Sequence, residues 1–237
     1  MIKDINVDSG TSCPALHKTH CYVKPFRVLN LYACLGGNRL LWEDCEVTAV
    51  ELDTELARMY QERFPNDTVI VADAHQYLLD HYKEFDFIRS SPPCPSHSLQ
   101  RFSQAKVRNN YTVLFPDFKL YEEIVFLDYY YDGKWVVENV IPFYKPIIPG
   151  KEIGRHLFWS NFTIASIATK KLSVCSGKDE VNNLCKHHKI DLSSYKGEQR
   201  KDKIARNLVD YEVGRTIFNT ARGIIEKSNV KQFDMFE

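Results

Sequence analysis

Two short apolar runs of the chain each deliver a reactive side chain near their carboxyl end. The run 85–91 leads through two prolines to the thiol of Cys94, and the run 135–140 carries the carboxyl group of Glu138. Both runs are predicted to be β-strands, and open α/β sheets place their chemistry at the carboxyl ends of their strands. A thiol and a carboxyl group at one such edge suggest a nucleophile and its acid partner. Taken alone, however, Cys94 fits a small buried hydrophobic residue equally well.

The residues around these two side chains favour the functional interpretation. Pro92 and Pro93 rule out a helical continuation, so the chain leaves the sheet in an extended conformation just before Cys94. Glu138 lies in the run Val-Val-Glu-Asn-Val, which is too apolar for a surface strand. Burial favours the protonated form of a carboxyl group, and that form can donate a hydrogen bond.

Three strands are predicted upstream, and each ends in a feature suited to a nucleotide cofactor. The first leads into a Gly-Gly turn at 34–39 that is predicted to open a helix. The second ends in Glu51, an acid suited to a ribose diol, and the third ends in Asp73. These strands are predicted at 26–33, 47–50 and 69–72. Each feature alone is common at strand ends, but together they form the pattern by which class I methyltransferases hold S-adenosylmethionine.

In order and spacing, these segments resemble the cytosine C5-specific DNA methyltransferases, over residues 26–162 and 207–226. The resemblance implies that Cys94 is the nucleophile, that the segment 138–140 carries the acid that holds the cytosine ring, and that the segment 211–217 returns to the cofactor. The cofactor-binding residues that it implies are Tyr32, Ala33, Cys34, Leu35, Gly37, Glu51, Leu52, Asp73, Ala74, Pro93, Thr216 and Ile217.

The chain departs from the family pattern at several positions. Asn30 and Cys34 stand where the family usually carries Asp and Gly, Pro95 follows the nucleophile where Gln is common, and Arg215 stands where Asn is usual. The segment 154–162 resembles the arginine-bearing strand of the family, but it offers one Arg and one His where two arginines are usual.

The resemblance also implies a reaction. Cys94 adds to carbon 6 of cytosine and makes carbon 5 nucleophilic enough to take a methyl group. Glu138 bonds N3 and the exocyclic amine, and Arg155, to which we assign the third catalytic role, contacts O2. The target nucleotide has to be flipped out of the duplex. No residue identifies itself as the base that removes the carbon 5 proton, which leaves water as the candidate.

Two segments are predicted to contact nucleic acid. The polar, basic segment 96–110 is predicted to be a mobile loop that closes over flipped DNA, with a solvated connector as the alternative. The segment 196–206 is a basic cluster. The predicted contacts are Ser96, His97, Arg101, Lys106, Arg108, Arg200, Lys201 and Lys203. Between them, apolar spacing predicts a helix over 114–127.

The predicted fold class is α/β: a Rossmann-like class I methyltransferase fold with a mainly parallel sheet, helices on both faces and a small recognition insert. We divide the chain into an N-terminal extension (1–25), a catalytic domain (26–162 and 207–237) and a target-recognition insert (163–206). Such a short insert can read few base edges, which favours a small target site, loose selectivity or a partner subunit.

Composition agrees with a soluble, cytoplasmic enzyme, and the resemblance implies a prokaryotic or phage-type setting. The 237 residues contain 44% hydrophobic residues but no stretch long enough to span a membrane, and the N-terminus lacks a secretory pattern. The seven cysteines, an odd number without a framework, indicate free thiols in a reducing compartment. The net charge is zero, so phosphate contacts must come from local clusters.

No metal site is predicted. Two groups have suitable side chains, but neither has paired Cys-x-x-Cys spacing at both ends, so free thiols and surface histidines are the preferred interpretation. The groups are Cys13, His17, His20 and Cys21, and Cys175, Cys185, His187 and His188.

The predicted function is methyl transfer from S-adenosylmethionine to carbon 5 of cytosine in double-stranded DNA, in a restriction-modification, regulatory or mobile-element setting, by a monomer or with a partner subunit. Two alternatives remain open. One is the same chemistry on RNA, as in the tRNA-acting branch of the family. The other is a nucleic-acid-binding relative without turnover, or one subunit of a split enzyme.

Overall fold

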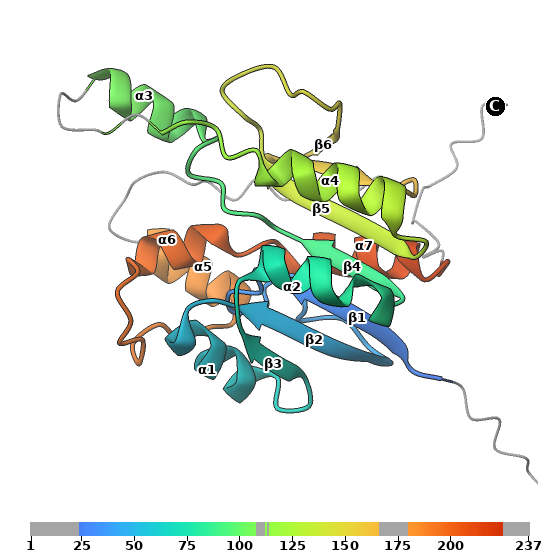
Figure 1. Cartoon of the computed structure of the whole chain (residues 1–237). Helices are drawn as coiled ribbons and strands as arrows, with labels where there is room; N and C mark the ends of the chain where they lie inside the picture. The colour runs from blue at the N-terminus through green and yellow to red at the C-terminus, as the bar shows by residue number, and fades with distance from the viewer. Residues whose placement is uncertain (1–23, 108–111, 113, 166–179, 225–237) are drawn as a thin grey trace, which may run out of the picture.

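The computed structural model describes residues 24–107, 112, 114–165 and 180–224, and within them the chain forms one seven-stranded sheet (Figure 1). The strand order is β3-β2-β1-β4-β5-β7-β6. Neighbours from β3 to β5 pair in parallel, and β7 runs antiparallel to both β5 and β6. The strands are β1 (Phe26–Leu31), β2 (Cys45–Glu51), β3 (Thr68–Val71), β4 (Phe87–Ser90), β5 (Lys134–Val140), β6 (Lys151–Ile153) and β7 (His156–Ser160).

Helices cover both faces of this sheet. One core joins the sheet to α2 (Ala74–His81) and α4 (Lys119–Tyr130). On the opposite face the sheet packs against α7 (Tyr211–Ala221) and α1 (Thr54–Arg63). Val28 and Leu29 of β1 enter opposite cores, and residues 28–31 are all buried, which explains why the central part of this strand is mostly apolar rather than alternating. The predicted fold class is therefore confirmed.

The segment between β1 and β2 contains no α-helix, so the prediction of a helix after the glycine turn is wrong. The backbone instead forms successive turns, with the amides of Gly36, Arg39 and Trp42 each bonded to the carbonyl three residues earlier. The physical reason is tertiary: the guanidinium of Arg39 is held by Asp67, and the Trp42 indole donates to the Gly214 carbonyl.

The C-terminal helix α7 presses directly on this cofactor-loop segment. A Cβ atom on Gly214 would lie 2.2 Å from the carbonyl oxygen of Asn38, and one on Gly37 would lie 2.7 Å from the carbonyl oxygen of Val209. Glycine at both positions therefore permits contact between backbones that are about 170 residues apart in sequence.

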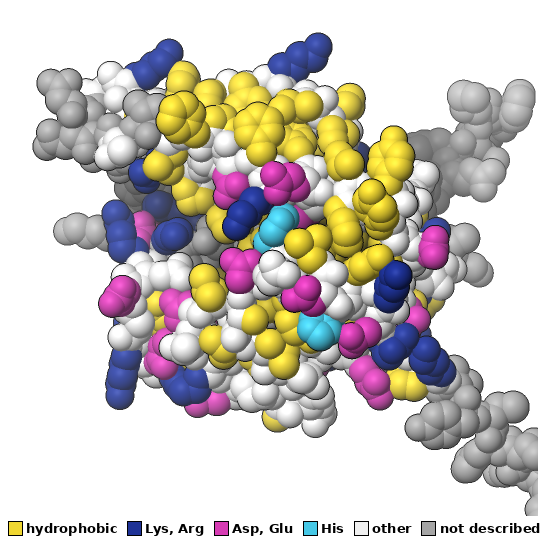
Figure 2. All heavy atoms as spheres, in the orientation of Figure 1, with side chains coloured by type: hydrophobic (Ala, Val, Ile, Leu, Met, Phe, Trp, Pro, Cys, Tyr) yellow, Lys and Arg dark blue, Asp and Glu magenta, His cyan; other side chains and the backbone are white. Residues whose placement is uncertain are grey.

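Two further segments differ from the predictions. The segment predicted as a mobile loop contains α3 (Leu99–Val107), because it lacks Gly and Pro and is rich in helix-forming Gln, Ala and Lys. The helix predicted over 114–127 begins only at Lys119, since Pro116 disfavours a helical conformation before it. Figure 2 shows hydrophobic side chains gathered over α4, where Phe118, Val125, Tyr129 and Tyr130 are exposed.

The described part of the insert packs onto the catalytic domain. Helices α5 (Glu180–His188) and α6 (Lys201–Asn207) share a core with Leu35 and with Leu56 and Met59 of α1. His187 pairs with Asp210, and His188 is buried beside it. The possible metal ligands Cys13, His17, His20, Cys21 and Cys175 lie outside the described residues. Along the described chain, no helix is long and apolar enough to cross a membrane.

Candidate active site

The thiol of Cys94 lies on the loop that leaves β4, and β5 holds this loop in place. The side-chain amide of Asn139 donates to the carbonyl of Pro92 over 2.9 Å, and the Cys94 carbonyl accepts from the backbone amides of His97 and Ser98. Burial raises the pKa of the Cys94 thiol, while the positive charges of Lys203 and Arg155 act in the opposite direction. The resting form is therefore the thiol, which these two cations bias toward the thiolate.

Glu138 lies near the carboxyl end of β5, is only 3% exposed, and contacts charged groups rather than solvent. Its Oε2 accepts a hydrogen bond from the guanidinium of Arg89, a buried residue of β4, and its Oε1 lies 3.8 Å from Nδ1 of His156. The sequence analysis missed Arg89, although a cation inside a run of buried apolar residues is itself a signal that a counter-ion is needed.

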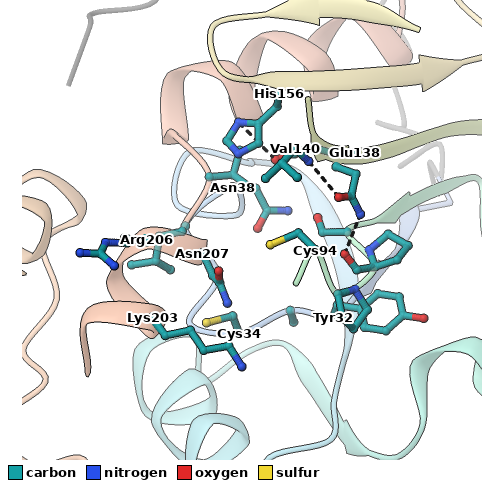
Figure 3. A pocket seen from close by; sticks show the side chains of 18 of the residues that line it. Tyr32, Cys34, Asn38, Cys94, Glu138, Val140, His156, Lys203, Arg206 and Asn207 are labelled. Carbon is teal, nitrogen blue, oxygen red and sulfur yellow. Dashed lines mark hydrogen bonds and ion pairs between the residues drawn. The ribbon is translucent and has the colours of Figure 1, made fainter. Parts of the chain in front are cut away.

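Arg155 and His156, in the segment that resembles the family's arginine-bearing strand, lie in different surroundings. His156 begins β7 opposite Val140, which brings its ring to the pocket wall beside Glu138 (Figure 3). Arg155 precedes the strand, and its guanidinium donates to the carbonyl of Arg206 over 3.0 Å. Burial lowers the pKa of the His156 imidazole, which favours its neutral form. The catalytic role of Arg155 remains a prediction, and His156 is the closer of the two to Glu138 in the pocket lining.

The cofactor end of the pocket is built around Glu51 at the end of β2. Its Oε2 accepts from the amide of Cys34 over 2.8 Å, and its Oε1 accepts from the amide of Asp53 over 3.0 Å. Asp53 in turn caps α1 by accepting from the amides of Glu55 and Leu56. Burial raises the pKa of Glu51, and it raises the pKa of the Cys34 thiol to about 12. Cys34 is therefore a neutral, inert thiol at neutral pH.

The loop after β1 is held in an unusual conformation by a buried acid that the sequence analysis also missed. Tyr32 and Cys34 both have positive φ, of 55° and 48°, which is uncommon outside glycine. The Tyr32 hydroxyl donates to Glu123 over 2.6 Å, and Ser90 and His75 contact the same carboxylate. Glu123 follows Leu120 by three residues and precedes Leu127 by four, which places it on the buried face of α4.

The predicted cofactor residues divide into those that line this catalytic pocket and those that do not. Tyr32, Ala33, Cys34, Gly37, Glu51 and Pro93 line the pocket together with Arg89, Cys94, Glu138 and His156. The others lie outside its lining: Leu35, Leu52, Asp73, Ala74, Thr216 and Ile217. Asp73 caps α2, Leu52 is exposed, and Ile217 is buried against the sheet.

The insert supplies the remaining wall of the catalytic pocket. Gln199, Lys203 and Arg206 of the insert line it, followed by Asn207 of the catalytic domain, and the Gln199 amide donates to Asp53 over 3.0 Å. Tyr195 also donates to Asp53. No periodic signal marked these residues, because their positions depend on how the insert folds back over α1.

A second hollow, which we call the basic groove, opens beside the catalytic pocket between α3 and α6. Its cationic lining consists of Arg101, Arg155, Arg200, Lys203 and Arg206, with Asp202 as the acidic member. Cys94, His156 and Lys203 line both hollows. The thiol therefore lies where a pocket suited to a small cofactor meets a surface suited to a polyanion.

The predicted nucleic-acid contacts are only partly gathered in the basic groove. Arg101, Arg200 and Lys203 line it, whereas Ser96 and Lys106 line an apolar hollow next to α3. Lys201 is exposed on α6. His97 is 1% exposed, and its Nδ1 lies 2.6 Å from the Tyr144 hydroxyl, so it belongs to the interior. Arg108 lies outside the described residues.

Comparison with solved structures finds methyltransferases of low similarity, and no curated protein matches the chain. A Spodoptera frugiperda DNMT2 mutant is 23% identical over 48% of this chain and 35% of its own, with a TM-score of 0.34. The putative methyltransferase yhhF from Escherichia coli is 16% identical over 56% of this chain and 73% of its own, with a TM-score of 0.38. A putative DNA modification methyltransferase of an Escherichia coli prophage is 19% identical over 51% and 33%, with a TM-score of 0.34.

The chain spans about a third of the DNMT2 and prophage structures. At the level of sequence families, residues 26–124 match the model of the C-5 cytosine-specific DNA methylases. This segment runs from β1 into α4 and includes Glu51, Asp73 and Cys94. The family recognised from the sequence is thus confirmed as a match of residues 26–124 to the model of the C-5 cytosine-specific DNA methylases.

Proposed function

We propose that the chain transfers a methyl group from S-adenosylmethionine to carbon 5 of cytosine in DNA, through a covalent adduct of Cys94. The observation that carries this proposal is the position of Cys94 on the shared lining of the catalytic pocket and the basic groove. A nucleotide flipped out of a duplex in the groove would bring its ring to the thiol, and the pocket behind the thiol would hold the methyl donor.

The residues at the base end of the pocket suit an addition to a pyrimidine ring. Once deprotonated, Cys94 forms a bond to carbon 6, and the displaced electron pair is shared by carbon 5, N3 and O2. Carbon 5 then takes the methyl group. Loss of the carbon 5 proton to water restores the ring double bond and releases the thiolate. Glu138 lines the pocket wall and would contact the ring edge that carries N3 and the exocyclic amine.

The cofactor end fits a nucleoside. Each oxygen of Glu51 accepts one backbone amide and keeps a lone pair for a ribose hydroxyl. Ala33 and Gly37 leave the backbone open to close approach, and a Cβ at Gly37 would already crowd Val209. When bound, S-adenosylmethionine supplies the electrophilic methyl group. Glu51, Cys34 and Leu56 would position it.

A nucleic acid is the polymer that the basic groove favours. Five cationic side chains line a single hollow in a chain whose net charge is zero. Arg200 and Arg206 are paired with Asp202 and Glu180, and an excess of positive charge remains in the hollow. Such a surface attracts phosphates of either DNA or RNA. The family match of residues 26–124 favours DNA, and the experiment therefore includes RNA as a separate arm.

The test measures incorporation of a labelled methyl group from S-adenosylmethionine into duplex DNA and into tRNA. We expect incorporation into DNA, and a complex that survives denaturation when the DNA carries 5-fluorocytosine, whose fluorine cannot be abstracted. Cys94→Ala should lose both. Cys45→Ala, which removes a free thiol outside both hollows, should keep both. Labelling of tRNA alone would contradict the DNA assignment, and the absence of an adduct would contradict covalent attack.

A further inference from the structure

The buried pair between Arg89 and Glu138 has no role in the reaction as described so far. Both residues are almost inaccessible, with 2% and 3% exposure, and both line the catalytic pocket. The register of β4 and β5 pairs Arg89 with Val136, so Glu138 lies two residues further along β5, on the same face as Val136. The guanidinium donates to Oε2 of Glu138 and, over 2.7 Å, to the hydroxyl of Ser91.

This pairing determines the charge on Glu138. An arginine does not lose its proton in proteins, so its partner must supply the compensating negative charge. Protonation of Glu138 would leave a buried cation without a counter-ion, which is strongly unfavourable. The sequence predicts a buried acid without a partner, whereas the structure gives it a cation 49 positions earlier in the chain.

The other charged or titratable groups around Glu138 do not restore the neutral acid. Burial lowers the pKa of His156 and so favours the neutral ring, whereas Arg155 adds positive charge. Burial raises the pKa of Cys94, so that thiol is neutral at rest. Among the described neighbours of Glu138, the charged groups are therefore Arg89 and Arg155, and both are positive.

We propose that Arg89 is a positioning residue that keeps Glu138 ionised, with Oε2 occupied and Oε1 available to accept a hydrogen bond from the exocyclic amine of the target cytosine. Glu138 then acts as a fixed acceptor and does not deliver a proton to N3. The electron balance needs no such proton, because methylation at carbon 5 consumes the pair that Cys94 displaces. This inference rests on the proposed function for its substrate, but the charge state of Glu138 can be tested without it.

The decisive measurement is the single-turnover rate of Arg89→Met relative to that of the wild-type protein, as a function of pH. Dividing the rate of Arg89→Met by the wild-type rate cancels the pH dependence that ionisation of Cys94 gives to both proteins. Without the cation, burial lets Glu138 take up a proton as the pH falls. If the ionised acceptor is needed, the ratio should be at least ~10-fold lower near pH 6 than near pH 8, as for loss of a required protonation state.

The alternatives give different curves. A ratio that rises as the pH falls would show that Glu138 works as an acid, and a ratio that is low but flat would show that Arg89 is only structural; either result overturns the proposal. Arg89→Lys retains the charge and should show a flat ratio above that of Arg89→Met. As a matched control, Arg58→Met breaks the exposed pairs with Glu55 and Glu62 on α1, outside the catalytic pocket, and should leave the ratio flat.

A second measurement remains valid if Arg89→Met does not fold or if the chain has no activity. The infrared difference spectrum between the folded wild-type protein and Glu138→Gln reports the state of this carboxyl group directly. We expect the loss of a carboxylate band near neutral pH. Loss of a protonated carboxyl band would overturn the proposal about Arg89, whereas inactivity of the wild-type protein with the expected spectrum would overturn only the proposed function.

Discussion

The two ends of the catalytic pocket each contain a buried carboxyl group, and the two are held in different ways. Glu51 at the cofactor end is bonded by backbone amides of Cys34 and Asp53. Glu138 at the base end is bonded by the side chain of Arg89. Backbone donors are present whenever the loop folds, and they do not titrate. A charged side chain fixes the ionisation state of its partner and can be removed by one substitution.

Under the proposed function, this difference implies that backbone amides would support cofactor binding, whereas methyl transfer would depend on a few charged side chains. Substitutions at the two ends of the pocket should therefore change different measured quantities. Substitutions at the base end should abolish or slow turnover without weakening cofactor binding, and those at the cofactor end should act mainly on affinity.

The largest expected effect is that of Cys94→Ala. Methyl transfer should be lost, because no other described thiol lines the basic groove and Cys34 is held neutral by burial. Calorimetry with S-adenosylhomocysteine should give a dissociation constant close to that of the wild-type protein. Turnover at the wild-type rate would remove Cys94 from the mechanism, and a parallel loss of cofactor binding would show that the two ends are not separate.

The next largest effect should be that of Glu138→Gln. The amide keeps the shape of the side chain but loses the charge that compensates Arg89, so single-turnover rates should fall by at least ~10²-fold. Glu152→Gln, an exposed change on β6, provides the matched control and should leave the rate unchanged. If Glu138→Gln weakened S-adenosylhomocysteine binding as much as it slowed turnover, the contrast between the two ends would fail.

At the cofactor end, Glu51→Ala should act on affinity. Removal of the acceptor frees the amides of Cys34 and Asp53 and removes the contact proposed for the ribose, so binding of S-adenosylmethionine should weaken by roughly 1.5–3 kcal/mol, the range for a hydrogen bond to a charged group. Glu46→Ala changes an exposed acid of the same strand and should bind normally. An unchanged dissociation constant for Glu51→Ala would contradict the assignment of this carboxylate.

The smallest effect concerns the tuning of Cys94 by its cationic neighbours. Burial raises the pKa of this thiol above its ordinary value of 9.0, so alkylation by iodoacetamide should accelerate as the pH rises past that value. Lys203 favours the thiolate, and Lys203→Gln should slow alkylation near pH 8 by roughly two- to fivefold, less than a full pKa unit. Lys201→Gln, on the same helix but outside both hollows, serves as the control. Equal effects of the two changes would mean that general charge, not the pocket, controls the thiol.

The strands and their polar ends could be predicted because they depend on local patterns. Apolar runs followed by Glu51, Asp73 or Cys94 produce the same signal in any parallel sheet. The pairing of Arg89 with Glu138 could not be predicted, since it depends on the register of β4 against β5. A periodic pattern identifies an element but not its neighbour.

The remaining differences arise where tertiary contacts override local preference. The turn after β1 was predicted to open a helix, but the anchoring of Arg39 and Trp42 to distant partners holds it as a loop. The role of the insert in reading the target stays a prediction, but the attachment of Gln199 and Tyr195 to Asp53 beside the cofactor end was not expected. These contacts join segments more than 140 residues apart, and no sequence window contains both partners.

The contact between α7 and the cofactor loop also has a consequence for the timing of synthesis. A ribosome makes the loop around Asn38 early, but the backbone that supports it, at Gly214, follows about 170 residues later. The emerging chain can build most of its parallel sheet before the loop has its support. Cofactor affinity should consequently appear late and abruptly in a series of stalled nascent chains, once residue 214 has left the exit tunnel.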